Sequence, residues 1–134
     1  MPDTTSTTSA APEPRGPYPH ARIEGGLIWV TGQIGRDPSS GLIVEGGFGS
    51  EFDQAIRNLQ SILGELGASL RDVVRTEVQF VRESDLDEMN AVYGRWFPAP
   101  QPARTSYGAA FLWKGALVQI SCVASATPPA EVSP

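Results

Sequence analysis

Cysteine and histidine, the usual zinc ligands of proteins, are scarce in this sequence, which has one of each among its 134 residues. A single cysteine excludes an internal disulfide and favours a reducing compartment, which we take to be the cytoplasm. Cys122 and His20 cannot build a zinc site by themselves, so we expect no metal. Cys122 lies on the apolar side of an alternating segment and is expected to be inert packing. His20 has no partner in the sequence and is expected at the surface.

Positive charge and long apolar runs are also scarce. Ten Lys and Arg against fifteen Asp and Glu give a net charge of −5. Because affinity for nucleic acids rests mainly on clustered positive charge, this balance argues against a nucleic-acid partner. No apolar run approaches the roughly 20 residues that a transmembrane helix needs, so we expect no membrane partner.

The two ends of the chain are poor in large apolar residues. Residues 1–15 are rich in Thr, Ser, Ala and Pro and have no apolar signal-peptide region, which predicts a disordered leader. Residues 127–134 have the same character and predict a flexible tail. Residues 16–126 are then a single domain, long enough for a core of two packed layers.

The first half of this domain shows a hairpin and a helix. A β-branched and aromatic run at residues 27–31 follows two glycines, which predicts a hairpin with residues 21–24. Ser50 is a natural N-cap and Gly67 a natural stop for the helix between them. Its apolar residues recur at helical spacing and form one stripe, so we interpret this helix as structural.

The second half adds a strand, a helix and two more strands. Residues 73–81 alternate, which predicts a strand with Val74, Thr76, Val78 and Phe80 towards the helices and Arg75, Glu77 and Gln79 away from them. A second helix is expected from Ser84 to about Phe97. Residues 104–111 and 117–124 then read as a hairpin around the short loop Leu112 to Gly115.

The order of these elements predicts an α+β fold, in which a mixed sheet carries two helices on one face. The other face of the sheet is left to water or to an oligomeric partner. If Phe111 pairs with Leu117, Arg104 lies five residues along the strand from the partner of Gln119, or roughly 16 Å. Two side chains that far apart cannot line one small-ligand site within a single subunit.

Arg104 and Asn90 are the polar residues that suggest a site. The stiff lead-in at Pro102 and the strand would fix the guanidinium of Arg104 as a bidentate clamp for a carboxylate. The alternative is a solvated or ion-paired arginine at a strand edge. Asn90 lies within the apolar stripe of the second helix and either bonds a nearby loop backbone or belongs to the site.

Five segments together resemble the RidA/YjgF family of imine deaminases, also described as the endoribonuclease L-PSP family. They are Gly16-Pro17-Tyr18, residues 30–34, residues 90–93, Pro102-Ala103-Arg104-Thr105 and residues 114–118, and they cover nearly the whole domain. The resemblance implies a chorismate-mutase-like fold and a homotrimer whose sheets face a central barrel. It also implies three ligand clefts between subunits.

The resemblance further implies roles for single residues. Arg104 would clamp the carboxylate of a small 2-imino acid, and Ser106 would help to place the substrate and a water. The family's cleft would be lined by Tyr18, Thr31, Gly32, Gln33 and Asn90, to which we add Tyr107, whose ring is otherwise a candidate for the core or an interface. A clamp, an oriented water and a proton donor suffice for an electrophilic imine carbon, so no cofactor is expected.

Gln119 departs from the family pattern, which has a glutamate at this position. An amide can orient a water but cannot accept its proton. Three interpretations therefore remain: an imine deaminase that produces 2-keto acids and ammonia, a relative with altered or no deaminase activity that binds or transforms a carboxylate metabolite, and a ribonuclease. The acidic charge disfavours the ribonuclease.

Overall fold

The computed structural model describes residues 4–126 and contains one six-stranded sheet with the strand order β1-β2-β3-β6-β4-β5. The strands are β1 (Thr5–Ser6), β2 (Ala21–Glu24), β3 (Leu27–Gln33), β4 (Val73–Phe80), β5 (Ala103–Gly108) and β6 (Val118–Ser125). The helices are α1 (Phe48–Glu65) and α2 (Leu86–Trp96), with single 3₁₀ turns η1 (Leu70–Asp72), η2 (Glu83–Asp85) and η3 (Trp113–Gly115). Among the strands of residues 4–126, β4 and β5 pair in parallel and all other neighbours pair antiparallel, so the sheet is mixed.

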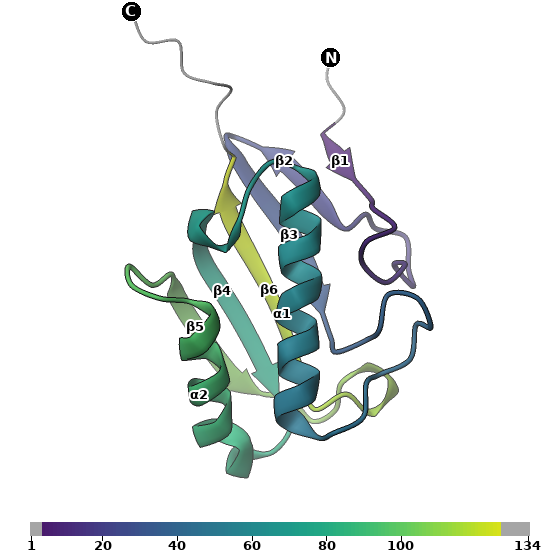
Figure 1. Cartoon of the computed structure of the whole chain (residues 1–134), viewed down its shortest axis with the longest axis vertical. Coiled ribbons are helices and arrows are strands. Elements are labelled where there is room, and N and C mark those ends of the chain that lie inside the picture. Colours follow the sequence, from purple (N-terminus) through teal and green to yellow (C-terminus); the bar gives the residue numbers. More distant parts are fainter. Residues whose placement is uncertain (1–3, 127–134) are drawn as a thin grey trace, which may run out of the picture.

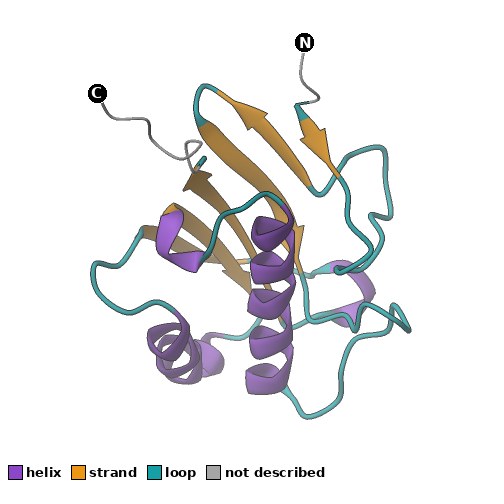
Figure 2. Ribbon diagram, turned by 45° about the horizontal axis from the view of Figure 1, so that its top comes forward, coloured by secondary structure: helices purple, strands orange, loops and turns teal. Residues whose placement is uncertain are grey.

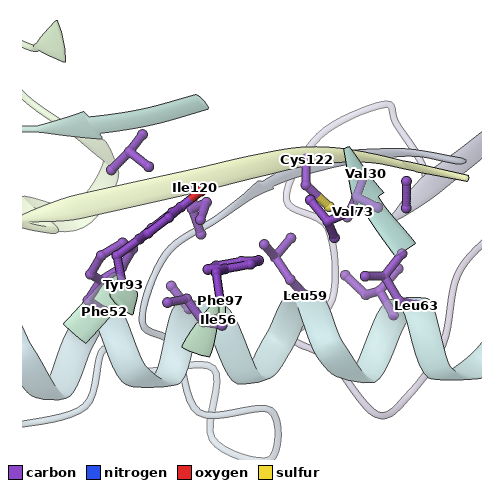
Figure 3. Close-up of a cluster of buried hydrophobic side chains, with 14 of the residues drawn as sticks. Val30, Phe52, Ile56, Leu59, Leu63, Val73, Tyr93, Phe97, Ile120 and Cys122 are labelled. Carbon is purple, nitrogen blue, oxygen red and sulfur yellow. The ribbon is translucent and has the colours of Figure 1, made fainter. Parts of the chain in front are cut away.

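Both helices pack on the same face of the sheet, as the sequence predicts (Figures 1 and 2). The apolar stripe of α1 and the inward residues of α2 meet the central strands in one continuous core (Figure 3). Phe52, Tyr93 and Phe97 form a stacked aromatic row between the two helices, with ring centroids 6.5 and 4.5 Å apart. The α+β architecture is therefore confirmed.

The helices begin at slightly different residues from those expected. α1 begins at Phe48 after Gly47, whose φ of 88° favours glycine, so Ser50 lies within the first turn and does not cap it. α2 begins at Leu86, because Ser84 belongs to the 3₁₀ turn η2 that precedes it. The hairpin of β2 and β3 turns at Gly25 and Gly26 as predicted.

The predicted hairpin between the last two strands is wrong. β4 lies between β5 and β6, pairing parallel with β5 and antiparallel with β6. The short loop before β6 carries the turn η3, and it returns the chain past β4 instead of beside β5 (Figure 1). A loop of this length fits a hairpin equally well, so only the long-range pairing decides between the two arrangements.

The outward face of the sheet also differs from the prediction at one residue. Val74 is 48% exposed, whereas Val73 is buried against the helices. The register of β4 against β6 shifts between Val73 and Arg75, and this irregularity moves Val74 out of the alternation. From Arg75 onward the strand is regular, and Thr76 and Val78 are buried as expected.

Residues 4–15 are ordered in the structure, which differs from the disordered leader expected there. Thr5 and Ser6 form β1 against β2, and Ala11 is buried. His20, expected at the surface, is 1% exposed and holds this segment. Its Nδ1 accepts from the backbone N–H of Thr8 at 3.0 Å, which leaves Nε2 to donate to the carbonyl of Pro12 at 2.6 Å. The predicted tail at 127–134 lies outside the described residues.

Cys122 is buried among the core residues of β6, as predicted. Its burial raises the pKa of the thiol to about 12, so the thiol is protonated and unreactive at neutral pH. Between residues 4 and 126, none of the helices is long and apolar enough to cross a membrane.

Candidate functional site

The predicted site residues fall into two separate groups, and the first surrounds a cavity of about 200 Å³ beside Gln119. The N-terminal segment, the end of β3 and the start of β6 contribute its walls. Tyr18, Gly32, Gln33 and Gln119 are the predicted residues among its lining, and Pro12, Pro14, Arg15, His20, Ile34, Arg36 and Trp113 complete it. Thr31, in β3, holds the chain around His20 beside the cavity, since both its backbone N–H and its hydroxyl donate to the carbonyl of His20.

Gln119 is held on the outward face of the sheet by a chain of amide contacts. Its Nε2 donates to Oε1 of Gln79 at 3.0 Å, and Nε2 of Gln79 donates to the hydroxyl of Tyr107 at 2.8 Å. These three residues lie side by side across β6, β4 and β5. Because Nε2 is engaged, Oε1 of Gln119 remains to accept a hydrogen bond from a water.

The close approach of Gln119 favours glycine at position 32. A side-chain carbon added at Gly32 would lie 2.8 Å from Cδ of Gln119, closer than such contacts allow. The missing side chain therefore leaves room for the amide against the backbone of β3. This is a packing reason for glycine in the segment Thr31-Gly32-Gln33.

Arg15 and Arg36 belong to the first group although the sequence analysis did not select them. Arg36 is 8% exposed, and its guanidinium carbon lies 5.3 Å from the centroid of the Trp113 ring. Burial and the nearby charge of Arg15 lower the pKa of Arg36. The signal in the sequence was weak, because Arg15 ends the segment interpreted as a leader and Arg36 lies in a run of turn residues.

The second group is centred on Arg104, at the edge strand β5 on the helix side of the sheet. Nη2 of Arg104 donates to Oδ1 of Asn90 at 2.8 Å, and its guanidinium carbon lies 4.7 Å from the centroid of the Tyr93 ring. Tyr93 is fixed in turn by a 2.8 Å hydrogen bond with the hydroxyl of Thr76. Burial raises the pKa of Tyr93, so the phenol stays neutral beneath the guanidinium.

Arg104 is exposed on the edge strand β5, which agrees with the solvated alternative, so its role as a carboxylate clamp stays a prediction. Arg104 takes part in none of the ion pairs formed within residues 4–126. Among the residues that the structure describes, the side chain of Asn90 bonds the guanidinium and no loop backbone. The arginine is thus held by neutral partners, which leave several of its N–H groups for an anion.

Ser106 lies on the same side of β5 as Arg104 but is hidden. Its hydroxyl oxygen is buried and makes no hydrogen bond within the part of the chain that the structure describes. A buried hydroxyl without a partner costs about 1–3 kcal/mol, so it calls for an explanation. The role of Ser106 in placing a water stays a prediction.

The two groups lie on opposite faces of the sheet. Arg104 pairs with Thr76 of β4, and Gln119 pairs with Gln79 of the same strand. Residues three apart on a regular strand point to opposite faces, and the two flanking strands place Arg104 and Gln119 roughly 14 Å apart. The predicted register was wrong, but its consequence holds, because one subunit does not bring both residues to one small ligand.

No cluster of three or more His, Cys, Asp or Glu side chains arranged to hold a metal occurs among residues 4–126. The polar side chains that converge at the two groups are arginines, amides and hydroxyls. Their chemistry suits the binding of carboxylates and the orientation of water, rather than coordination of a metal.

Comparison with known protein families gives a match over residues 8–126 to the family described as Endoribonuclease L-PSP. The human 2-iminobutanoate/2-iminopropanoate deaminase is 38% identical over 122 residues, which are 91% of this chain and 89% of that protein. The match begins at residue 8, and so it includes part of the segment that the sequence analysis set aside as a leader.

Solved structures agree with this match. RidA from the Antarctic bacterium Psychrobacter has a TM-score of 0.87 and 33% identity, covering 90% of this chain and 98% of its own. TdcF from E. coli, solved with bound serine, has a TM-score of 0.86 and 25% identity, covering 92% and 98%. The sequence and the fold therefore point to the same relatives.

Proposed function

The chain belongs to the endoribonuclease L-PSP family, the RidA/YjgF family that its motifs resemble, and from this premise we propose that it hydrolyses 2-imino acids to 2-keto acids and ammonia. The observation that carries the proposal is Arg104, an arginine positioned by Asn90 and Tyr93 and left without a carboxylate partner in residues 4–126. The human relative is named for hydrolysis of two such imines, and TdcF was solved with an amino acid bound.

The active site is completed by a second copy of this chain. Arg104 of one subunit and Gln119 of its neighbour meet in a cleft between them, and a homotrimer closes this heterologous contact into a ring. The outward sheet face supports the assembly, because it exposes 48% of Trp29 and 48% of Tyr107. Large rings of this kind at a surface favour a protein partner.

The carboxylate of the substrate binds the guanidinium of Arg104, and the imine carbon beside it then faces Gln119 of the neighbour. Oε1 of Gln119 accepts a hydrogen bond from a water, and this bond directs a lone pair of the water oxygen at the imine carbon. The new C–O bond gives a carbinolamine. Its C–N bond then breaks, so that R–C(=NH)–COO⁻ and H₂O become R–C(=O)–COO⁻ and NH₃.

The proton of the attacking water needs an acceptor other than Gln119, because an amide has no useful basicity. The nitrogen of the carbinolamine is itself an amine, and amines accept protons readily near neutral pH. The substrate therefore supplies the base, and Gln119 acts by orientation alone. This division of roles predicts a slower deaminase than one with a carboxylate at position 119.

Cys122 supports a cytoplasmic location for this activity. It is the single cysteine of the sequence and is buried in the core, so the fold is not stabilised by an internal disulfide. A protein of this kind suits a reducing compartment, where imines released by amino-acid-degrading enzymes would also be found.

The test is to generate 2-iminopropanoate from serine with a dehydratase and to measure the release of ammonia and pyruvate. Addition of the protein should raise the rate of release above that of spontaneous hydrolysis. The Arg104→Ala variant serves as the matched control and should return the rate to the spontaneous value. An identical rate with and without the wild-type protein would contradict the proposal.

A further inference from the structure

Two arginines in the wall of the Gln119 cavity are not used by the proposed hydrolysis. Arg15 and Arg36 both line this cavity. Arg36 is held rigidly, since its Nε donates to the carbonyl of Gly41 at 3.0 Å and its Nη1 to the carbonyl of Glu13 at 3.2 Å. Trp113 covers the guanidinium at 5.3 Å. A positioned, 8% exposed arginine with neutral partners is typical of an anion site.

The second guanidinium lies close to the first. Nη2 of Arg15 and Nη2 of Arg36 both lie 3.5 Å from the position that a side-chain carbon at Gly41 would take, so they are at most twice that distance apart. Neither arginine takes part in the ion pairs formed within residues 4–126. The nearby Glu13 contributes its backbone carbonyl to Arg36, and its negative charge acts on Arg36 without forming an ion pair within residues 4–126.

Like charges held together cost free energy unless an anion lies between them. The N-terminal segment nevertheless brings Arg15 to Arg36, because His20 fixes Thr8 and Pro12 against the domain. The cavity that the two arginines share with Gln119 has a volume of about 200 Å³. Sites for drug-sized ligands have about 300–1,000 Å³, so this cavity suits one end of a small ligand.

We propose that Arg15 and Arg36 bind a second carboxylate of the substrate, and that the protein acts on 2-imino dicarboxylates. The inference rests on the proposed function, in which Arg104 of the neighbouring subunit binds the carboxylate next to the imine carbon. The distal carboxylate then extends past Gln119 into the cavity. Two clamps at opposite ends fix the imine carbon between them and thereby align it with the water on Gln119.

Calorimetry with two keto acids of equal chain length tests this specificity. 2-Oxoglutarate and 2-oxopentanoate share the first carboxylate and the keto group, and they differ at the far end in a carboxylate against a methyl group. We expect wild-type protein to bind 2-oxoglutarate at least about 10-fold more tightly, as the gain of charge-assisted hydrogen bonds predicts.

Arg15→Gln and Arg36→Gln should each reduce this preference about 10-fold and leave the affinity for 2-oxopentanoate within about 2-fold. Arg71→Gln on η1 is the matched control, because it removes the same charge from an exposed residue outside the cavity. Arg36 is buried, so its variant is first checked by thermal unfolding. Arg15 is exposed, and its variant keeps the test decisive if Arg36→Gln fails to fold.

Equal affinity of the wild type for the two keto acids would overturn the inference, and so would an undiminished preference in folded variants. Imines generated from alanine and from glutamate with amino-acid oxidases separate this outcome from a failure of the proposed function. Equal hydrolysis of the two imines would overturn the second clamp alone. A preference for 2-oxoglutarate that the variants lose, without hydrolysis of any imine, would support the second clamp and overturn the deaminase.

Discussion

At the scale of single residues, Arg104 is positioned by partners that carry no negative charge. Asn90 offers an amide oxygen and Tyr93 offers a ring face, and neither neutralises the guanidinium. A carboxylate at either position would satisfy the arginine within the subunit and compete with the ligand. The neutral partners therefore fix its direction without reducing its affinity for an anion.

Replacement of Arg104 by lysine should weaken binding of 2-oxobutyrate by more than about 10-fold, although the charge is unchanged. Lysine is a point charge without the planar pair of donors, and it cannot reach Asn90 and a carboxylate in the same way. Calorimetry measures the loss. Arg95→Lys on the exposed side of α2 is the control and should bind as the wild type does. Equal affinity in Arg104→Lys would contradict the clamp.

Replacement of Gln119 by glutamate should raise the rate of 2-iminopropanoate hydrolysis by about 10-fold or more, because a carboxylate can accept the proton of the attacking water. Gln79 tolerates the change, since its amide can turn and donate Nε2 to the new carboxylate. Steady-state kinetics gives the rate, and binding of 2-oxobutyrate shows whether the cleft is intact. An unchanged rate in a variant that still binds would show that basicity is not what the parent lacks.

Sequence reasoning identified the residues with a strong local pattern and missed those defined by distant contacts. The inert packing of Cys122 followed from the alternation of its own strand. His20 was expected at the surface, because its partners Thr8 and Pro12 lie in a segment with no pattern of its own. Arg36 was missed for the same reason, since Glu13 and Trp113 come to it from opposite ends of the chain.

At the scale of elements, the end of β3 positions the cleft by leaving out a side chain. Gly32→Ala should lower imine hydrolysis at least about 10-fold. The added side-chain carbon would lie 2.8 Å from Cδ of Gln119, so the amide of Gln119 would have to move away from the position in which it orients the water. The melting temperature should change little, as the displaced amide lies at a partly open surface. Activity assays and thermal unfolding together check this result.

Gly64→Ala on α1 is the control for that variant. A side-chain carbon at Gly64 would meet no atom of residues 4–126 within 4 Å, and alanine favours a helix by about 1 kcal/mol over glycine. This variant should therefore be more stable and equally active. Full activity in Gly32→Ala would show that the packing of Gln119 against β3 is not needed for the reaction.

Single elements of the fold could be predicted from the sequence, but the pairing between distant strands could not. The helices, the first hairpin and β4 were predictable, because each depends on periodicity and turn residues within one segment. The place of β4 between β5 and β6 was not, because parallel pairing with β5 joins residues that are far apart in the chain. The irregularity at Val74 was hidden for a similar reason, since only the pairing with β6 creates it.

At the scale of the whole molecule, the sheet divides the proposed site into halves. One half faces the helices at the edge strand β5, and the other lies on the outward face beside β3 and β6. A head-to-tail contact between two copies brings the Arg104 half of one copy to the Gln119 half of the next. In a ring of three copies, every Arg104 half then meets one Gln119 half. The substrate would then be bound only by the assembled protein.

Mixed oligomers test this arrangement, because a cleft shared between subunits can be restored by two different defective chains. Arg104→Ala and Gln119→Ala proteins should each be inactive alone. After dissociation and reassembly at equal amounts, about one quarter of the clefts should receive Arg104 from one chain and Gln119 from the other, as random pairing around a head-to-tail ring requires. Imine hydrolysis should then recover to about one quarter of the wild-type rate.

The doubly substituted protein, Arg104→Ala with Gln119→Ala, is the control when mixed with either single variant, since no cleft can then be complete. A site within one subunit would restore nothing in any mixture, and a monomer by light scattering that still hydrolyses the imine would exclude the shared cleft.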